Sequence, residues 1–407
     1  MNPLCLIQLV SEQAMPNLLP ILRLQPARVF SITTEATADR APKIQSAALR
    51  AGCRFEHDSV RLSGMPSILE TARAVHRCIA LARSAGLTPV LNFTGGTKLM
   101  SIGAFQQAAA DAVPSFYVDT RAERLEDGAT APGFLALLGG DASLSSITPS
   151  LTLDVIVAAC GHQSVCPGRD WRPLVPAADF LLRHPGDAAL VKEALHGRNG
   201  LFPNGREPRR PEDWLPFLDK TFPLPPELLR LLAPTGAVRA LGDDRAALPD
   251  STADALRHLG SGEHIPGFAA LYFEAVEPLQ QSLAFLTGGW FEVVVARAMQ
   301  LSGRFRDIRW SAKVGQLGGA FLEEDLLALD GLEAACVSCK SSSERNRTLS
   351  HLEEFQSRAH SIGGRMTRRF LAFLALHDPK GHIASRAAAL GIKILTPSEL
   401  SRPSPFA

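Results

Sequence analysis

The sequence predicts an α/β protein of more than one domain, with a doubly wound parallel sheet in its N-terminal third. Short apolar runs alternate with helical patterns through the first 120 residues, which is typical of βαβ units. The chain has 407 residues, whereas a typical domain has roughly 100–200. An Asp-Gly pair at 330–331, between two strand-like runs, predicts a hairpin near the C-terminus.

The N-terminal elements follow from the period of their apolar residues. Right-handed crossovers place helices on both faces of a parallel sheet, and ligands bind at the carboxyl ends of its strands. The loops after the first and fourth strands, residues 10–17 and 92–98, are therefore expected at the ligand-binding edge. Strands are predicted at 4–10, 27–33, 55–61, 88–93 and 115–119, and helices at 37–51, 65–85 and 98–110.

Composition excludes several classes of protein. A hydrophobic content of 46% argues against wholesale disorder, and a net charge of +1 argues against a chain that is basic throughout. Seven cysteines are too few for a disulfide scaffold. The N-terminus lacks a basic region before its short apolar run, and no 18 consecutive residues are apolar. We therefore expect a cytoplasmic protein without a membrane partner.

The loop Asn92-Phe-Thr-Gly-Gly-Thr-Lys98 has the features of an anion site. Gly95 and Gly96 allow a tight turn with exposed N–H groups, Thr97 can cap the next helix, and Lys98 adds positive charge at its N-terminus. The spacing fits neither a Walker A loop nor a G-x-G-x-x-G motif. The alternative interpretation is an ordinary strand-to-helix turn with Lys98 in solvent.

This loop, together with the loop that follows the first strand, resembles the ligand loops of CARF domains. These domains are the Rossmann-like sensors of cyclic oligoadenylate in type III CRISPR defence. The resemblance implies a homodimer whose paired loops cradle a ring-shaped oligonucleotide, with cyclic tetra-adenylate as the expected activator. The implied ligand-binding residues are Ser11, Gln13, Asn17, Asn92, Thr94, Gly95, Gly96, Thr97 and Lys98.

The middle of the chain is less informative. Residues 151–159 form an apolar run that either closes the first sheet or bridges two domains, and prolines become frequent after residue 203. Helices are expected at 187–196, 227–233 and 250–259, with a hairpin turning at Gly242-Asp243, which would permit a winged-helix-like module. Cys160, His162 and Cys166 match no common zinc pattern.

The C-terminal hairpin predicts a cluster of charges. With Asp330-Gly331 as the turn, Leu329 faces Leu332, Asp325 faces Cys336 and Glu323 faces Ser338. Glu323, Asp325, Ser338 and Lys340 would then share one face, while Glu324, Val337 and Cys339 share the other, which makes Cys336 and Cys339 a poor chelating pair.

Carboxylates on one face suit a divalent metal, and a lysine beside them suits transition-state stabilisation. Glu292 is expected in the first turn of a helix that follows Gly288-Gly289. The alternative is a hairpin decorated with ordinary surface charges, which explains Glu323 better than Lys340.

These segments resemble the PD-(D/E)XK restriction-type nuclease that is fused to CARF sensors. The resemblance implies Mg²⁺ or Mn²⁺ as cofactor, with Glu292, Glu323 and Asp325 as the expected metal ligands. Ser338 departs from the pattern, because an acid is expected two positions before the lysine, and we hypothesise that Glu323 compensates. The segments are Gly-Trp-Phe-Glu292, Glu323-Glu-Asp325, Cys-Lys340-Ser and 386–395, and the implied catalytic residues are Glu292, Asp325, Ser338 and Lys340.

Charge distribution favours a nucleic-acid substrate, single-stranded DNA or RNA. Residues 356–407 hold eight Lys or Arg against two acids, a local charge of +6, and the loop Ser361–Arg365 is expected to approach the substrate.

The sequence thus predicts a CARF sensor at 1–145, a linker or helical region at 146–280 and a nuclease domain at 281–407. The resulting hypothesis is an endonuclease activated by cyclic oligoadenylate. The alternatives are a ligand-sensing regulator that has lost catalysis, and a sensor domain that degrades its own ligand.

Overall fold

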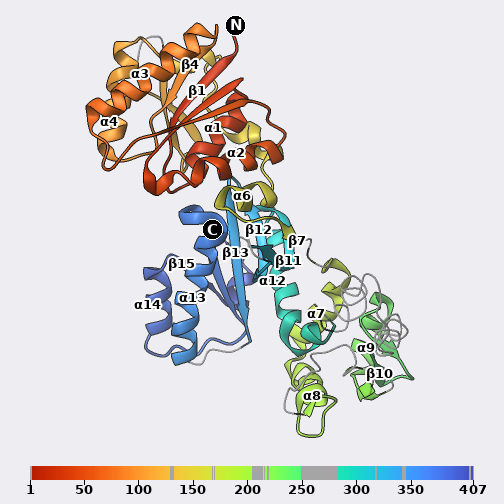
Figure 1. Cartoon of the computed structure of the whole chain (residues 1–407). Coiled ribbons are helices and arrows are strands. Elements are labelled where there is room, and N and C mark those ends of the chain that lie inside the picture. Colours follow the sequence, from red (N-terminus) through yellow and green to blue (C-terminus); the bar gives the residue numbers. More distant parts are fainter. Residues whose placement is uncertain are drawn as a thin grey trace.

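Two β-sheets organise the chain, one near each end, in a computed structural model of the protein (Figure 1). The N-terminal sheet lies at the top of the view and the C-terminal sheet below it. The residues that the structure describes are 2–128, 133–166, 168, 170–203, 214, 216–217, 220–248, 280, 282–316, 319–341, 345–402 and 405–406.

The N-terminal sheet confirms the predicted parallel, doubly wound topology. Its strand order is β3-β2-β1-β4-β5-β6, and the pairs are parallel except for β5 with β6. Helices α1 and α2 pack on one face, and α3 and α4 on the other. The strands are β1 (Leu4–Leu9), β2 (Arg28–Thr33), β3 (Glu56–Arg61), β4 (Thr88–Asn92), β5 (Ser115–Asp119) and β6 (Arg124–Asp127); the helices are α1 (Met15–Leu24), α2 (Arg40–Arg50), α3 (Ile68–Ser84), α4 (Lys98–Ala110) and α5 (Phe134–Leu137).

Helix α1 was not expected, because its sequence contains two prolines. Pro16 lies in the first turn, where the missing N–H costs nothing, and only Pro20 lies inside the helix. Nearly all of α1 is buried against the sheet, and this burial outweighs the poor helix propensity.

A single short helix, α6 (Leu153–Cys160), joins the two units. It packs against α2 on one side and against α13 (Arg345–Gly363) on the other. Its apolar residues are therefore buried all round, as expected for a helix enclosed on several sides. Of the two interpretations of residues 151–159, the bridge between domains is confirmed.

The C-terminal sheet is mixed, with strand order β15-β14-β13-β12-β11-β7. The pairs β7–β11, β11–β12 and β12–β13 are antiparallel, whereas the pairs β13–β14 and β14–β15 are parallel. Helix α12 covers one face and α13 the other. The strands are β7 (Val165–Cys166), β11 (Phe305–Gly315), β12 (Phe321–Asp330), β13 (Glu333–Lys340), β14 (Arg368–Phe373) and β15 (Ile392–Leu395); the helices are α12 (Trp290–Leu301), α13, α14 (His382–Ala389) and α15 (Pro397–Leu400).

The middle region packs on the C-terminal unit. Its edge strand β7 belongs to that sheet, and α7 lies against α12. The predicted hairpin is confirmed by the pairing of Ala240 with Ala246, next to β8. The helix expected at 250–259 lies outside the described residues. The elements are α7 (Val175–Arg183), α8 (Pro185–His196), β8 (Thr221–Pro223), α9 (Pro226–Leu232), β9 (Arg239–Ala240) and β10 (Arg245–Ala247).

One helical segment, Ser282–Leu301, is long and apolar enough to span a membrane by length and composition. It includes α12, and 61% of its most apolar window is buried inside the protein. Such burial is typical of the central helix of a globular unit.

The hairpin of β12 and β13 differs from its predicted register by two positions. Asp330 pairs with Glu333, and Leu327 with Cys336, so the predicted pairing of Asp325 with Cys336 is wrong. Gly331 takes a φ of +61° and opens the two-residue loop, as in a turn whose first central residue is glycine. The Asp-Gly pair therefore straddles the end of the strand instead of forming the loop.

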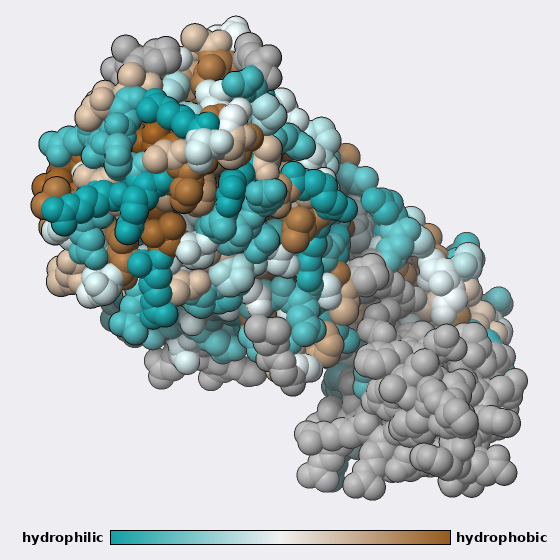
Figure 2. Space-filling view, turned by 45° about the horizontal axis from the view of Figure 1, so that its top comes forward, coloured by the Kyte–Doolittle hydropathy of each residue, from teal (hydrophilic) through white to brown (hydrophobic). Residues whose placement is uncertain are grey.

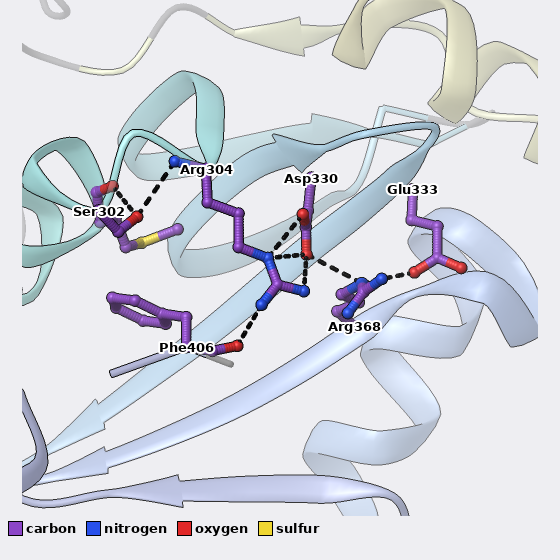
Figure 3. A network of polar contacts seen from close by, with 7 residues as sticks. Ser302, Arg304, Asp330, Glu333, Arg368 and Phe406 are labelled. Atoms are coloured by element: carbon purple, nitrogen blue, oxygen red, sulfur yellow. Dashed lines mark hydrogen bonds and ion pairs between the residues drawn. The ribbon is translucent and has the colours of Figure 1, made fainter. Parts of the chain in front are cut away.

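Asp330 is placed at the strand end by a network of ion pairs (Figure 3). Arg304 Nε donates to both carboxylate oxygens of Asp330, at 2.8 and 2.9 Å, and Arg368 Nε lies 2.8 Å from Oδ2. Arg368 also contacts Glu333 at 2.7 Å. The network ties the hairpin to the residue before β11 and to the start of β14.

We expect Asp330→Asn to destabilise the C-terminal unit by about 2–4 kcal/mol, because a nearly buried carboxylate would leave two guanidinium groups without its charge. Urea unfolding followed by tryptophan fluorescence measures this, since all four tryptophans lie in the core of that unit. Glu353→Gln, in the exposed pair with Arg386, is the control and should cost under about 1 kcal/mol. Equal effects of the two changes would contradict the assignment.

Candidate ligand and catalytic sites

The loops after β1 and β4 touch through their backbones, and Gly95 makes this possible. A Cβ at Gly95 would lie 2.0 Å from the carbonyl oxygen of Leu9, so that position accepts no side chain. Gly96 has a φ of +75°, which favours glycine. Thr97 caps α4 by accepting the N–H of Met100, as the sequence predicted.

Two of the predicted ligand residues are buried, and their side chains form hydrogen bonds that hold these loops in place. Asn17 donates to Leu9 O at 2.8 Å, and Asn92 donates to Pro16 O at 2.9 Å. The Asn92 carbonyl accepts the hydroxyl and the N–H of Thr94, whose hydroxyl in turn accepts the Val118 N–H. Both amides therefore use their hydrogen bonds inside the protein and hold the loops in place.

A cavity of about 450 Å³ opens at this edge of the sheet. Five of the predicted residues line it, whereas Asn17, Asn92 and Gly95 lie behind it and Lys98 is an exposed first residue of α4 outside its lining. The lining is rich in hydroxyl groups and includes the N-terminus of α4, which suits an anion. The predicted residues in the lining are Ser11, Gln13, Thr94, Gly96 and Thr97, and those not predicted include Thr34, Thr37, Tyr117, Thr120 and Arg365.

In the C-terminal unit, Asp325 is the centre of a polar cluster. Its Oδ2 accepts the Ser338 hydroxyl at 3.0 Å and the backbone N–H of Cys339 at 2.6 Å, and Lys340 Nζ lies 3.9 Å away. Three groups from β13 thus converge on one carboxylate of β12.

Glu292 comes from the first turn of α12 and lies beside the same cluster. Burial and the nearby Asp325 carboxylate raise the pKa of Glu292 to about 8, against the lowering effects of the Trp310 hydrogen bond and Lys340. Trp310 Nε1 donates to Glu292 Oε2 at 2.6 Å. The sequence prediction that an acid of this helix meets the hairpin agrees with this geometry.

His351 of α13 was not predicted from the sequence. Its Nε2 lies 3.1 Å from Ser338 Oγ. Burial and the charges of Lys340 and Arg358 lower the pKa of His351 to about 4, so the ring is neutral at neutral pH. Because the Ser338 hydroxyl donates its only proton to Asp325, Nε2–H of His351 must be the donor to Ser338. The order His351, Ser338, Asp325 is not that of a catalytic Ser-His-Asp triad, in which the histidine lies in the middle.

The hypothesis that Glu323 stands opposite Ser338 is wrong. Asp325 occupies that position, and Glu323 accepts a hydrogen bond from Ser311 at 3.3 Å. Ser311 has a φ of +51°, and its neighbours Trp310 and Ala312 pack into different cores, so β11 changes face there.

The adjoining part of β12 is irregular as well. Glu324, predicted to share a face with Val337 and Cys339, instead pairs with Arg358 of α13, whereas Val337 and Cys339 pack in the core that contains α12. The prediction for the cysteines is confirmed, since Cys336 and Cys339 pack into opposite cores.

Three arginines of the basic C-terminal segment pair with carboxylates from outside that segment. Arg358 pairs with Glu324, Arg368 with Asp330 and Glu333, and Arg386 with Glu353. Of the expected loop Ser361–Arg365, residues 361–363 instead end helix α13, and Arg365 lines the cavity of the N-terminal unit.

The donor set fits a magnesium ion that keeps most of its waters, because Glu292 and Asp325 are two carboxylates in electrostatic contact. Within the described part of the chain, no three His, Cys, Asp or Glu side chains are grouped closely enough to enclose a metal ion. The hydroxyl of Ser338 is a weak ligand and is already bonded to Asp325.

Residues 5–127 match the family model of the Card1 CARF domain. The N-terminal unit is a CARF domain. The match ends at β6, so it covers the sensor-like sheet and leaves the C-terminal unit unassigned. No curated protein matches the sequence.

Three solved structures share the fold of the chain. Can2 from Sulfobacillus thermosulfidooxidans, in complex with cyclic tetra-adenylate, has a TM-score of 0.63 at 16% identity, over 98% of this chain and 94% of its own. Protein VC1899 from Vibrio cholerae has a TM-score of 0.70 at 12% identity, over 98% and 96%. A type III CRISPR defence DNA nuclease activated by cyclic oligoadenylate has a TM-score of 0.55 at 15% identity, over 93% and 46%.

We expect Gly95→Ala to destabilise the CARF domain by about 3 kcal/mol or more, because the added methyl group meets the Leu9 carbonyl. Calorimetry of the full chain should show the loss of stability as an unfolding transition at a lower temperature. Gly186→Ala, in α8 with open space around it, should change stability by less than about 1 kcal/mol. An unchanged transition in Gly95→Ala would disprove the close approach of the loops.

Proposed function

We propose that the protein is a metal-dependent endonuclease of type III CRISPR defence that cyclic oligoadenylate activates. The observation that carries the proposal is the presence, in one chain, of a CARF domain and of a Glu292, Asp325 and Lys340 cluster on a second α/β sheet. The shared fold with Can2 and with the CRISPR defence DNA nuclease supports it, and favours cyclic tetra-adenylate as the activator.

The ligand would bind in the cavity at the carboxyl ends of β1 and β4. The hydroxyl of Thr97 and the N-terminus of α4 would provide donors for phosphate oxygens. Lys98 is exposed at the start of α4, outside the cavity lining. In a symmetric dimer, Lys98 would face the bound ligand from there.

A second copy of the chain would cover an apolar patch on α3 and α4. Met65 is 94% exposed, Leu69 59%, Leu99 48% and Ile102 44%. Brown residues interrupt the teal surface on that side of the N-terminal unit (Figure 2). Helix α4 also carries buried apolar residues on its inner side, and a helix that is apolar all round is normally covered. The patch adjoins the start of α4, so a two-fold axis there would bring two cavities together.

The C-terminal unit would then hydrolyse a phosphodiester bond of single-stranded DNA or RNA, as a restriction-endonuclease-like domain. Glu292 and Asp325, with Glu323 nearby, would hold a Mg²⁺ or Mn²⁺ ion, which supplies a water of lowered pKa and neutralises charge at phosphorus. Lys340 would place its ammonium group against the scissile phosphate. Ser338 and His351 fix the orientation of the Asp325 carboxylate through hydrogen bonds.

A second candidate function is a ligand-sensing regulator that binds nucleic acid without cutting it. The replacement of the expected acid by Ser338 favours it, because a hydroxyl that donates to Asp325 contributes little to metal binding. The two candidates make opposite predictions for cleavage and the same prediction for ligand binding.

If α3 and α4 form the dimer interface, the double change Leu99→Glu and Ile102→Glu should weaken association by about 100-fold or more. Sedimentation of the wild type and the variant measures this. Leu190→Glu, at a leucine of α8 that is 64% exposed, is the control and should remain a dimer. A monomeric wild type, or a dimeric double variant, would contradict the assigned interface.

Labelled single-stranded DNA and RNA should be cleaved by the wild type only with cyclic tetra-adenylate and Mg²⁺ or Mn²⁺, and chelation should abolish cleavage. Lys340→Ala should lower the rate by about 100- to 1000-fold, because it removes a positive charge aimed at the transition state. Lys380→Ala, at an exposed lysine of the same unit, should retain full activity.

Undiminished cleavage by Lys340→Ala would rule out this cluster as the catalytic site. A wild type that binds the ligand and nucleic acid but cuts neither substrate in either metal would establish the regulator instead.

A further inference from the structure

Arg365 reaches the CARF cavity from the other unit of the protein. It lies in the 3₁₀ turn Gly364–Met366 that directly follows α13, and it lines the ligand cavity together with Thr34, Thr97 and Tyr117. It also lines a second cavity, of about 370 Å³, between the two units, with Arg40, Lys43 and His360. The two cavities share Glu12, Gln13 and Arg365.

The guanidinium group of Arg365 is available for a ligand. Its side chain is exposed, and it has no hydrogen bond or ion pair with any described residue, whereas Arg358, Arg368 and Arg386 of the same segment are paired with carboxylates. Among the described residues that line the ligand cavity, it is the single Lys or Arg. Glu12 also lines the cavity, and its carboxylate would repel an oligonucleotide phosphate, which the positive charge of Arg365 would offset.

Two glycines before Arg365 set the path of the backbone that brings this residue to the cavity. A Cβ at Gly363 would lie 2.5 Å from Thr367 Oγ1, and Gly364 has a φ of +73°, so the two glycines end α13 and turn the chain sharply. The same helix holds His351 against Ser338 in the catalytic cluster. About 18 Å of helix separates His351 from Gly363, at about 1.5 Å per residue. The same helix therefore contacts the catalytic cluster through His351 and ends beside the ligand cavity.

We propose that Arg365 is a ligand-binding residue that the C-terminal unit contributes to the CARF site. The inference rests on the proposed function and names a contact within it. The guanidinium group binds one phosphate of the cyclic oligoadenylate. The other oxygens of that phosphate accept hydrogen bonds from the N-terminus of α4. The bound ligand then contacts both units at once and stabilises the arrangement in which α13 reaches the cavity, which gives it a differential affinity for that state.

The test measures binding of fluorescently labelled cyclic tetra-adenylate to the full-length protein. Arg365→Ala should weaken binding by about 10- to 100-fold, the effect of losing one charge-assisted phosphate contact. Arg365→Lys, which keeps the charge but loses the planar fork, should fall between the two. Arg402→Ala, at another exposed arginine of the same unit, should bind as the wild type does.

Hydrogen exchange separates a ligand contact from a merely structural role. Ligand should slow amide hydrogen exchange in residues 345–366 of the wild type. In Arg365→Ala this protection should be lost, whereas the protection of residues 92–100 should persist at saturating ligand. A folded Arg365→Ala protein with wild-type affinity and wild-type protection of 345–366 would overturn the proposal and leave the proposed function intact. A wild type that fails to bind the cyclic nucleotide at all would overturn the proposed function, and this inference with it.

Discussion

The burial of α6 is the constraint on which the rest of the structure depends. Its apolar residues pack against α2 and α13, so one continuous core contains residues from both sheets. A core of this kind has the density of a single domain, and the two units cannot separate along it without exposing apolar surface. The position of α13 relative to the CARF cavity is therefore a consequence of packing rather than of a flexible linker.

The two candidate sites are stabilised in different ways. The CARF loops are held by buried amides and by a backbone contact at Gly95, which makes the cavity rigid before any ligand binds. The C-terminal cluster instead brings Glu292 and Asp325 into mutual repulsion in a partly buried place, which raises the pKa of Glu292. A rigid cavity suits recognition, whereas two close carboxylates retain unfavourable energy that a cation can relieve.

The features that follow from the local pattern of apolar residues could be predicted from the sequence. The features that depend on contacts between residues far apart in the sequence could not. The strands and helices of the CARF sheet follow from apolar patterns, and the Gly95, Gly96 and Thr97 turn follows from backbone chemistry. The hairpin register was mispredicted because Asp330 forms ion pairs with Arg304, just before β11, and with Arg368 of β14. A count of residues likewise cannot show that Arg358, Arg368 and Arg386 of the C-terminal segment pair with carboxylates from outside it. His351 and Arg365 carry no motif, and only the packing of α13 places them.

The contacts around residue 338 explain why a serine, and not an acid, suits that position. An acid at this position would stand beside Asp325 and close to Glu292, and would place a third negative charge in a partly buried cluster with Lys340 as the nearest cation. The hydroxyl instead donates to Asp325 and accepts from the neutral His351, so it is satisfied both as donor and as acceptor. The cluster is thus complete as a hydrogen-bonded unit, and its capacity for a metal ion depends on the two remaining carboxylates.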